Sequence, residues 1–177
     1  MEEGCRTEQA SGGEEVTLGV ASSSLGTVLV GVTRKGIRFV RIGDDDDALR
    51  EDLSRDDERA VIMAESVARL IDGSADAVDA PLDIRGTAFQ QTVWQALREI
   101  PAGSTLTYAG LAERIGRPSA TRAVARACAT NDLAVVIPCH RVVRSDGNLA
   151  GYRWGVERKR ALLEREGRAF QQDGPNQ

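Results

Sequence analysis

A cysteine and a histidine stand side by side in the segment LAVVIPCHRVV, residues 133–143. Cys139 is a potential nucleophile, and His140, the only histidine of the chain, is a potential base. A free thiol with a pKa of about 8.5 is mostly protonated at neutral pH, so a reactive cysteine needs a base or a positive field. Arg141 and Arg144 follow the pair closely and would supply positive charge. These residue types predict nucleophilic chemistry at Cys139.

The residues before the cysteine form an apolar run, which predicts a buried strand over residues 133–137. Pro138 has no N–H for a strand ladder, so it should end the strand and leave Cys139 at a turn that faces a cleft. Adjacent side chains of an extended chain point to opposite sides, so His140 would reach the thiol through a water molecule or a turn. The other interpretation of a cysteine, a small buried hydrophobe, fits Cys128 better.

Three predicted helices in the second half of the chain would position this pair. The first covers residues 87–100, where apolar residues recur at helical spacing, and Pro101 and Gly103 end it. A short helix in TYAGLAERIG is closed by Gly116, and Ser119 is expected to cap the next helix, ATRAVARACAT. Two short helices joined by a turn that contains glycine indicate a helix-turn-helix.

Arg122 and Arg126 stand four residues apart on the second helix of this pair, so both should project from one face beside Ala125 and Ala129. Small side chains let such a face approach a surface closely, and arginines suit insertion into a nucleic-acid groove with phosphates held alongside. The alternative is an ordinary solvated basic face above packed apolar residues. The residues of the helix by themselves leave both interpretations open.

The first half of the chain has the pattern of a sheet. Residues 16–42 alternate in strand fashion between turn signals, which predicts a small antiparallel meander, and a broken helical period follows up to Gly73 through Leu49 and Leu53. Residues 73–86 are small, acidic and proline-containing, as is typical of a linker. The sequence therefore predicts an α/β (α+β) fold with a flexible tail at 1–15, a sheet-and-helix domain at 16–80, a linker at 81–86, a mostly helical domain at 87–170, and a second tail at 171–177.

The two halves of the chain differ in charge. Residues 1–80 carry 9 Lys and Arg against 18 Asp and Glu, whereas residues 81–177 carry 14 against 9. A basic half joined to an acidic half indicates a polyanionic partner for the basic half alone. Ordinary solvated faces are the alternative explanation.

The composition argues against several classes of protein. No apolar run approaches the roughly 18 residues of a membrane-spanning helix, and the first residues are acidic where a signal peptide would be basic and then apolar. Three cysteines at unrelated spacings do not form a disulfide framework, and one histidine without a CxxC pair cannot build a zinc site of the usual type. We expect a cytoplasmic chain with reduced thiols and with no metal, cofactor or membrane partner.

Together these motifs resemble the DNA alkyltransferases that repair guanine alkylated at O6. The segment IPCHRVV carries the likeness, with TYAGLA and RAVARACATN before it and SDGNLAGYRWGVERKRALLEREG after it. The likeness covers about residues 84–167 and is nearest to the bacterial adaptive-response branch of the family. It implies that the preceding sheet-and-helix segment is the family's small ribonuclease-H-like amino-terminal domain.

The resemblance implies a role for each matching residue of the reactive segment. Cys139 would accept the alkyl group, and His140 would take the thiol proton through a water molecule. Glu166 would orient the histidine, and Asn131 would tie the recognition helix to the active-site turn.

The resemblance also implies which residues handle the DNA. Arg122 would fill the place of a nucleotide flipped from the duplex, with the helix-turn-helix in the minor groove, and Tyr108 would help to rotate the 3′ phosphate and meet the base. The guanine pocket would be lined, largely through backbone groups, by Val142, Tyr152 and Arg153. The remaining residues expected at the DNA surface are Ser119, Thr121 and Arg126.

The implied function is direct-reversal DNA repair by a methylated-DNA–protein-cysteine S-methyltransferase. A monomer would flip O6-alkylguanine, and also O4-alkylthymine, out of double-stranded DNA and transfer the alkyl group irreversibly to Cys139 in a single turnover. Two alternatives remain open. One is an alkyltransferase-like protein that binds damage without repairing it, although such proteins replace the acceptor cysteine. The other is a cysteine hydrolase that uses Cys139, His140 and Glu166 and would need an oxyanion hole.

Overall fold

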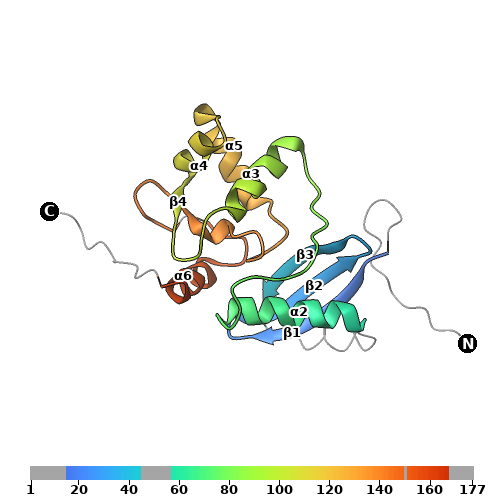
Figure 1. Ribbon diagram of the computed structural model, residues 1–177. Coiled ribbons are helices and arrows are strands. Elements are labelled where there is room, and N and C mark those ends of the chain that lie inside the picture. Colours follow the sequence, from blue (N-terminus) through green and yellow to red (C-terminus); the bar gives the residue numbers. More distant parts are fainter. Residues whose placement is uncertain (1–14, 45–56, 150, 168–177) are drawn as a thin grey trace, which may run out of the picture.

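The structure is a computed structural model, and it describes residues 15–44, 57–149 and 151–167. Leu49, Leu53 and most of the two predicted tails lie outside these ranges. Figure 1 shows a sheet covered by one helix, with a second, mostly helical half beside it. This is the mixed α/β architecture that the sequence predicts. In the described part of the chain, no helix combines the length and apolar character needed to cross a membrane.

The three predicted strands form an antiparallel meander. They are β1 (Thr17–Ser23), β2 (Gly26–Thr33) and β3 (Gly36–Gly43), in the order β1-β2-β3. Their alternating apolar residues, including Val28, Val30 and Val40, are fully buried. The turn before β3 requires a glycine, because Gly36 has a φ of 141° and an added Cβ would lie 2.0 Å from the carbonyl oxygen of Pro81.

Helix α2 (Glu58–Ile71) covers one face of the sheet (Figure 1). Asp57 caps it, because its side chain accepts a hydrogen bond from the N–H of Ala60. The helix lies close to β1 at Gly19, where an added Cβ would lie 2.2 Å from the carbonyl carbon of Ala60. Small residues at this crossing therefore set the distance between helix and sheet.

The segment predicted as a linker lies against the edge of β3. The N–H of Ile37 donates to the carbonyl of Pro81 at 2.9 Å, and the N–H of Asp83 donates to the carbonyl of Ile37 at 2.8 Å. The Asp83 side chain is buried, where it accepts hydrogen bonds from Thr33 at 2.9 Å and from Arg85 at 2.7 Å. Residues 81–85 thus fix the crossing from the sheet half to the helical half.

The helical half begins with α3 (Ala88–Arg98). Its start is set by a capping box, in which the Thr87 side chain and the Gln90 side chain each bind the other's backbone N–H. Trp94 is a core residue, as expected, and its indole N–H donates to the carbonyl of Ala127 at 2.9 Å. The other elements of this half are β4 (Leu106–Thr107), α4 (Tyr108–Arg114), α5 (Thr121–Ala129), β5 (Val142–Val143) and α6 (Val156–Arg165).

Helices α4 and α5 form the predicted helix-turn-helix, but the expected cap at Ser119 is wrong. Gly116 ends α4 with a φ of 72°, and Pro118–Ala120 then form a short 3-10 turn that runs directly into α5. Ala120 occupies the cap position of α5 and makes no side-chain hydrogen bond there. Because the helical turn already begins at Pro118, the residue before Ser119, Ser119 lies inside the turn and not at the boundary of a helix.

The strand predicted over residues 133–137 is also wrong. The run is largely buried, but only Leu133 pairs with the sheet, through an isolated parallel bridge to Val40. The next residues form a turn in which Val135 has a φ of 65°, and the N–H of Ile137 donates to the carbonyl of Leu133 at 3.0 Å. Apolar content predicts burial, whereas a strand also needs a neighbouring strand to pair with, and the sheet offers one bridge here.

Candidate active site

Cys139 opens a short 3-10 turn, Cys139–Arg141, directly after Pro138. The thiol-bearing residue is 5% exposed and His140 is fully buried. The N–H of Val142 donates to the carbonyl of Cys139, and β5 begins at this point. Strand β5 pairs in parallel with β4, which leads into Tyr108 at the start of α4. The turn is therefore held between the helix-turn-helix and α6.

Asn131 connects the end of α5 to the cysteine turn. Its amide nitrogen lies 3.3 Å from Sγ of Cys139 and donates to the carbonyl of Ile137 at 2.9 Å. Its side-chain oxygen accepts the N–H of Leu133 at 2.9 Å, and its own N–H donates to the carbonyl of Cys128 in α5. One buried side chain thus organises the turn that the apolar pattern could not predict.

His140 and Arg141 both bind Glu166, at the end of α6. Nε2 of His140 lies 2.8 Å from Oε1 of Glu166, and Arg141 donates to both carboxylate oxygens at 3.0 and 2.8 Å. Burial favours the neutral form of Glu166, but the hydrogen bonds from His140 and Arg141 outweigh it and lower its pKa to about 2. The carboxylate is therefore ionised at neutral pH.

An ionised Glu166 fixes the proton on the histidine. Because the carboxylate can only accept, Nε2 of His140 carries the hydrogen and Nδ1 keeps a free lone pair. Burial lowers the pKa of His140, and Glu166 offsets this only in part, so the ring is neutral. Nδ1 is buried and has no hydrogen-bond partner among the described residues. It is the proton acceptor available at this site.

The thiol of Cys139 rests in its protonated form. Burial raises its pKa, and the hydrogen bond from Asn131 and the charges of Lys159 and Arg153 offset this only in part. A buried neutral thiol cannot act as a nucleophile until it loses its proton. Nδ1 of the adjacent His140, which has no hydrogen-bond partner within the described ranges, is a group that could accept this proton.

Lys159 is a site residue that the sequence analysis did not identify. Its side chain is fully buried, and Nζ donates to the carbonyl of Val142 at 2.7 Å. It stands three and four residues before Leu162 and Leu163, which are also buried, so it lies on the apolar face of α6. A lysine at a core position of an amphipathic helix was the available signal.

Two tyrosines lie near the thiol. Tyr108 is half-buried, and burial together with the nearby thiols raises its pKa to about 12. The hydroxyl of Tyr152 is buried without a hydrogen-bond partner in the described part of the chain, and its ring packs edge-on against Trp154 at 5.3 Å. Arg153, between them in sequence, turns its side chain to the surface and pairs with Asp132. Tyr108 and Tyr152 therefore both lie close enough to Cys139 for its charge to affect their pKa values.

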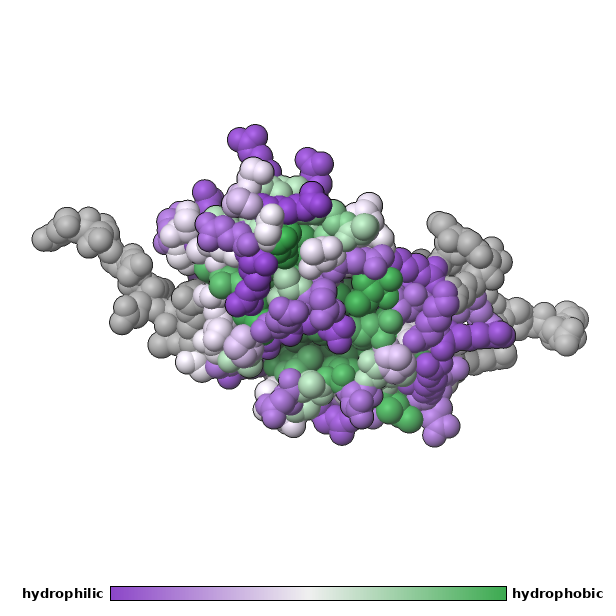
Figure 2. All heavy atoms as spheres, turned by 45° about the horizontal axis from the view of Figure 1, so that its top comes forward, coloured by the Kyte–Doolittle hydropathy of each residue, from purple (hydrophilic) through white to green (hydrophobic). Residues whose placement is uncertain are grey.

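The DNA-surface residues predicted on the second half lie on one end of the molecule. Arg122, Arg126 and Ser119 are exposed, whereas Thr121 is half-buried. Neither Arg122 nor Arg126 forms an ion pair with any described residue. Figure 2 shows hydrophilic side chains projecting at this end, with residues of intermediate hydropathy between them. The arrangement leaves the guanidinium groups available to an anionic surface.

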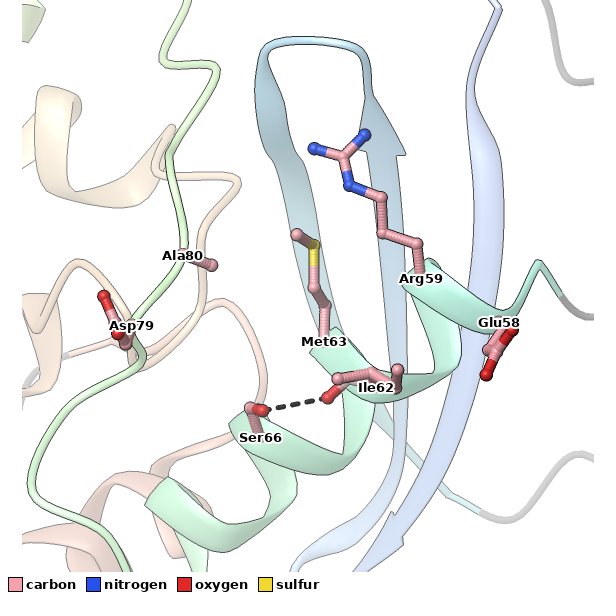
Figure 3. A pocket seen from close by; sticks show the side chains of 7 residues that line it. All are labelled: Glu58, Arg59, Ile62, Met63, Ser66, Asp79 and Ala80. Atoms are coloured by element: carbon pink, nitrogen blue, oxygen red, sulfur yellow. Dashed lines mark hydrogen bonds between the residues drawn. The ribbon is translucent and has the colours of Figure 1, made fainter.

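A cavity of about 340 Å³ lies elsewhere, between α2 and residues 79–80 (Figure 3). It is lined by Glu58, Arg59, Ile62, Met63, Ser66, Asp79 and Ala80. None of the residues around Cys139 contributes to it. This cavity therefore belongs to the sheet half and is separate from the buried Cys139.

The comparison with known proteins identifies the class. Residues 88–168 match the family model described as 6-O-methylguanine DNA methyltransferase, DNA binding domain. A crystal structure of the Mycobacterium tuberculosis O6-methylguanine methyltransferase is 37% identical, with a TM-score of 0.72, and the match covers 85% of this chain and 92% of that one. The corresponding protein of Pyrococcus kodakaraensis is 27% identical, with a TM-score of 0.66 over 86% of this chain and 99% of that one. The chain belongs to the O6-methylguanine DNA methyltransferase family.

Within the family, the chain is similar to Ada. The bifunctional transcriptional activator/DNA repair enzyme Ada of Escherichia coli is 50% identical over 166 residues, which are 88% of this chain and 47% of Ada. The methylated-DNA–protein-cysteine methyltransferase of Mycobacterium bovis is 51% identical over 94 residues, which are 53% of this chain and 57% of that protein. The chain thus spans about half the length of these curated relatives.

Proposed function

We propose that the protein repairs alkylated DNA by direct reversal, moving the alkyl group from O6 of guanine to Sγ of Cys139 once per molecule. The observation that carries the proposal is the buried thiol of Cys139 next to His140, whose Nε2 is held by the ionised Glu166. The likeness to proteins named methylated-DNA–protein-cysteine methyltransferase supports the same reaction.

The proposed chemistry is a proton transfer followed by a displacement. The thiol proton passes to Nδ1 of His140, through a bridging water molecule, and Glu166 stabilises the imidazolium. The thiolate then attacks the alkyl carbon, a C–S bond forms, and the bond between that carbon and O6 breaks. The electron pair leaves with guanine, to which the Tyr108 hydroxyl donates a hydrogen bond. The proton that His140 took from the thiol is then released and neutralises the guanine anion, so His140 and Tyr108 both return to their resting forms. The thioether product cannot be hydrolysed by any base in the site, so Cys139 is consumed.

The proposed handling of DNA follows from the position of the thiol. O6 of guanine is buried in a duplex, so the nucleotide must leave the stack, and a poorly paired alkylated base is cheaper to extrude. Helix α5 would lie in the minor groove, where Arg122 takes the place of the extruded nucleotide and Arg126 holds phosphate. A crystal structure of the similar M. tuberculosis protein in complex with DNA supports DNA as the partner. O4-alkylthymine is a second proposed substrate, and the cytoplasm is the proposed location.

The two alternatives receive less support from the site. A protein that only bound damage would not need the alkyl acceptor Cys139 or a histidine held in one tautomer. A hydrolase would need donors aimed at an oxyanion, whereas the Asn131 amide, which lies 3.3 Å from Sγ, already binds the carbonyl of Ile137.

A labelled duplex tests the proposal. The protein is mixed with DNA that carries one radiolabelled O6-methylguanine, and label on protein is counted. We expect one label per protein molecule, none with Cys139→Ala, and continued lesion binding by that variant. Cys128→Ala, which removes the other buried thiol, is the matched control and should still accept one label. Turnover beyond one equivalent, or tight binding with all label left on the DNA, would contradict the proposal.

A further inference from the structure

The side chain of Arg153 bridges two walls of the closed site. Its Nη1 lies 2.5 Å from Oδ1 of Asp132 and 3.4 Å from the carbonyl oxygen of Asn131. Asn131 is the residue whose amide lies against Sγ of Cys139. The bridge therefore joins residues 152–154, on one wall, to the turn that holds the thiol, on the other.

The site is closed to a purine as long as these walls meet. Cys139 is 5% exposed and Trp154 is 8% exposed. The Tyr152 hydroxyl, which lies near the thiol, is buried with no partner in the described residues. A base large enough to bring O6 to Sγ must displace the aromatic wall, and this movement separates Arg153 from Asp132.

The backbone around the aromatic wall permits such a movement. Gly151 and Gly155 flank it with φ values of 26° and 100°, and nothing lies within 4 Å of a Cβ added at Gly151. The N–H of Gly155 donates to the carbonyl of Tyr152 at 2.9 Å, so residues 152–155 form one turn. Arg158 of α6 donates a hydrogen bond to the carbonyl of Trp154 and so anchors the C-terminal end of the aromatic wall. The wall can therefore move at its N-terminal end, at Gly151.

We propose that Arg153 is a latch on the mouth of the base pocket, closed by Asp132 in the free protein and released to a DNA phosphate when the flipped base enters. Both side chains of the pair are about two-fifths exposed, so a phosphate can compete for the guanidinium. The bound strand would also repel the Asp132 carboxylate. The phosphate half of this inference rests on the proposed function, whereas the closed latch does not.

The latch also predicts that opening is easy. An exposed ion pair contributes little to stability, so breaking it should increase the open population only about two- to fivefold. A strong buried bridge at this position would instead block the substrate.

Two variants separate a latch from a simple change of charge. Asp132→Asn and Arg153→Met both break the pair, and methionine keeps an aliphatic stem above Trp154. Their effects on the thiolate are opposite, because removing the carboxylate favours a negative sulfur and removing the guanidinium disfavours it. Their effects on a latch are the same.

The first measurement is the rate at which iodoacetamide alkylates Cys139, followed by peptide mass spectrometry without DNA. We expect both variants to react about two- to fivefold faster than the wild type. Glu157→Gln, which breaks an exposed Glu157–Arg160 pair on α6, is the matched control and should react at the wild-type rate. If Arg153→Met reacts at or below the wild-type rate, the latch is refuted whatever Asp132→Asn does.

The second measurement is binding to lesion-containing duplex at several salt concentrations, with Cys139→Ala present in every protein to prevent transfer. Arg153→Met should reduce the slope of log affinity against log salt by about one, as expected for one lost phosphate contact. Glu157→Gln should keep the slope. An unchanged slope with Arg153→Met refutes the phosphate contact. A wild-type protein that takes no label from DNA refutes the proposed function, and the iodoacetamide rates still decide the latch.

Discussion

The carboxylate of Glu166 should make the protein sensitive to acid, and Glu166→Gln should remove that sensitivity. The side chain accepts hydrogen bonds from His140 and from Nε and Nη2 of Arg141, and it is 16% exposed. A glutamine keeps the size of the side chain but cannot be ionised. It therefore loses the charge that fixes the histidine tautomer and balances Arg141.

The size of the effect follows from the pKa. Glu166 ionises at about 2 in the folded protein against an ordinary value of 4.5. A difference of this size corresponds to about 3 kcal/mol of stability, because each factor of ten in acidity is worth about 1.4 kcal/mol. The folded-state pKa is the lower one, so this contribution is complete above pH 4.5 and is lost as the pH falls toward 2.

Urea unfolding of both proteins across pH 2 to 7 measures this contribution. The free energy of unfolding of Glu166→Gln should be about 3 kcal/mol below that of the wild type at pH 7, and the gap should close toward pH 2. Glu164→Gln, at an exposed position on the same helix, should stay within about 0.5 kcal/mol of the wild type throughout. A gap for Glu166→Gln that is constant with pH would show that Glu166 is not the ionised partner of His140 and Arg141.

Three further variants test the site. His140→Gln should slow transfer to Cys139 by about 10²- to 10⁴-fold in single-turnover assays. The wild-type rate should stay level down to below pH 6.5, because burial lowers the pKa of His140 and keeps the ring neutral. A wild-type rate that begins to fall above pH 7 would contradict this. Asn131→Ala leaves buried backbone groups unpaired and should lower the free energy of unfolding by about 1–3 kcal/mol; full stability in urea would exclude its organising role. Arg122→Ala should slow transfer from duplex DNA but not the reaction with the free base O6-methylguanine, whereas Arg114→Ala on α4 should affect neither. Equal rates for both variants on duplex DNA would remove Arg122 from base extrusion.

The elements whose residues repeat along the chain could be predicted from sequence. The strands of the sheet alternate in polarity, and the capping box at Thr87 and the positive φ at Gly116 mark helix ends through local chemistry. Such signals depend on neighbours in the sequence. They are therefore visible without the fold.

The features that could not be predicted depend on contacts between distant residues. The turn over residues 133–137 exists because the Asn131 side chain satisfies its backbone, and no periodicity encodes that bond. In the sequence VERKRALLEREG, Lys159 does not differ from the other charged residues. Its position in the site depends on its hydrogen bond to the carbonyl of Val142, a residue distant in sequence. The pair of Arg141 with Glu166 joins residues 25 positions apart in the same way.

The contacts of helix α6 indicate which parts of the chain are needed to hold the active site together. While Lys159 faces the cysteine turn, Arg158 donates to the carbonyl of Leu25 at 2.8 Å and Arg165 donates to the carbonyl of Ile71 at 2.7 Å. The sheet half contributes none of the site residues, but its backbone carbonyls hold α6, and with it Glu166, in position. A shortened protein made of the helical half alone would leave both arginines without these partners. It would need other contacts to hold α6 before Glu166 could orient His140.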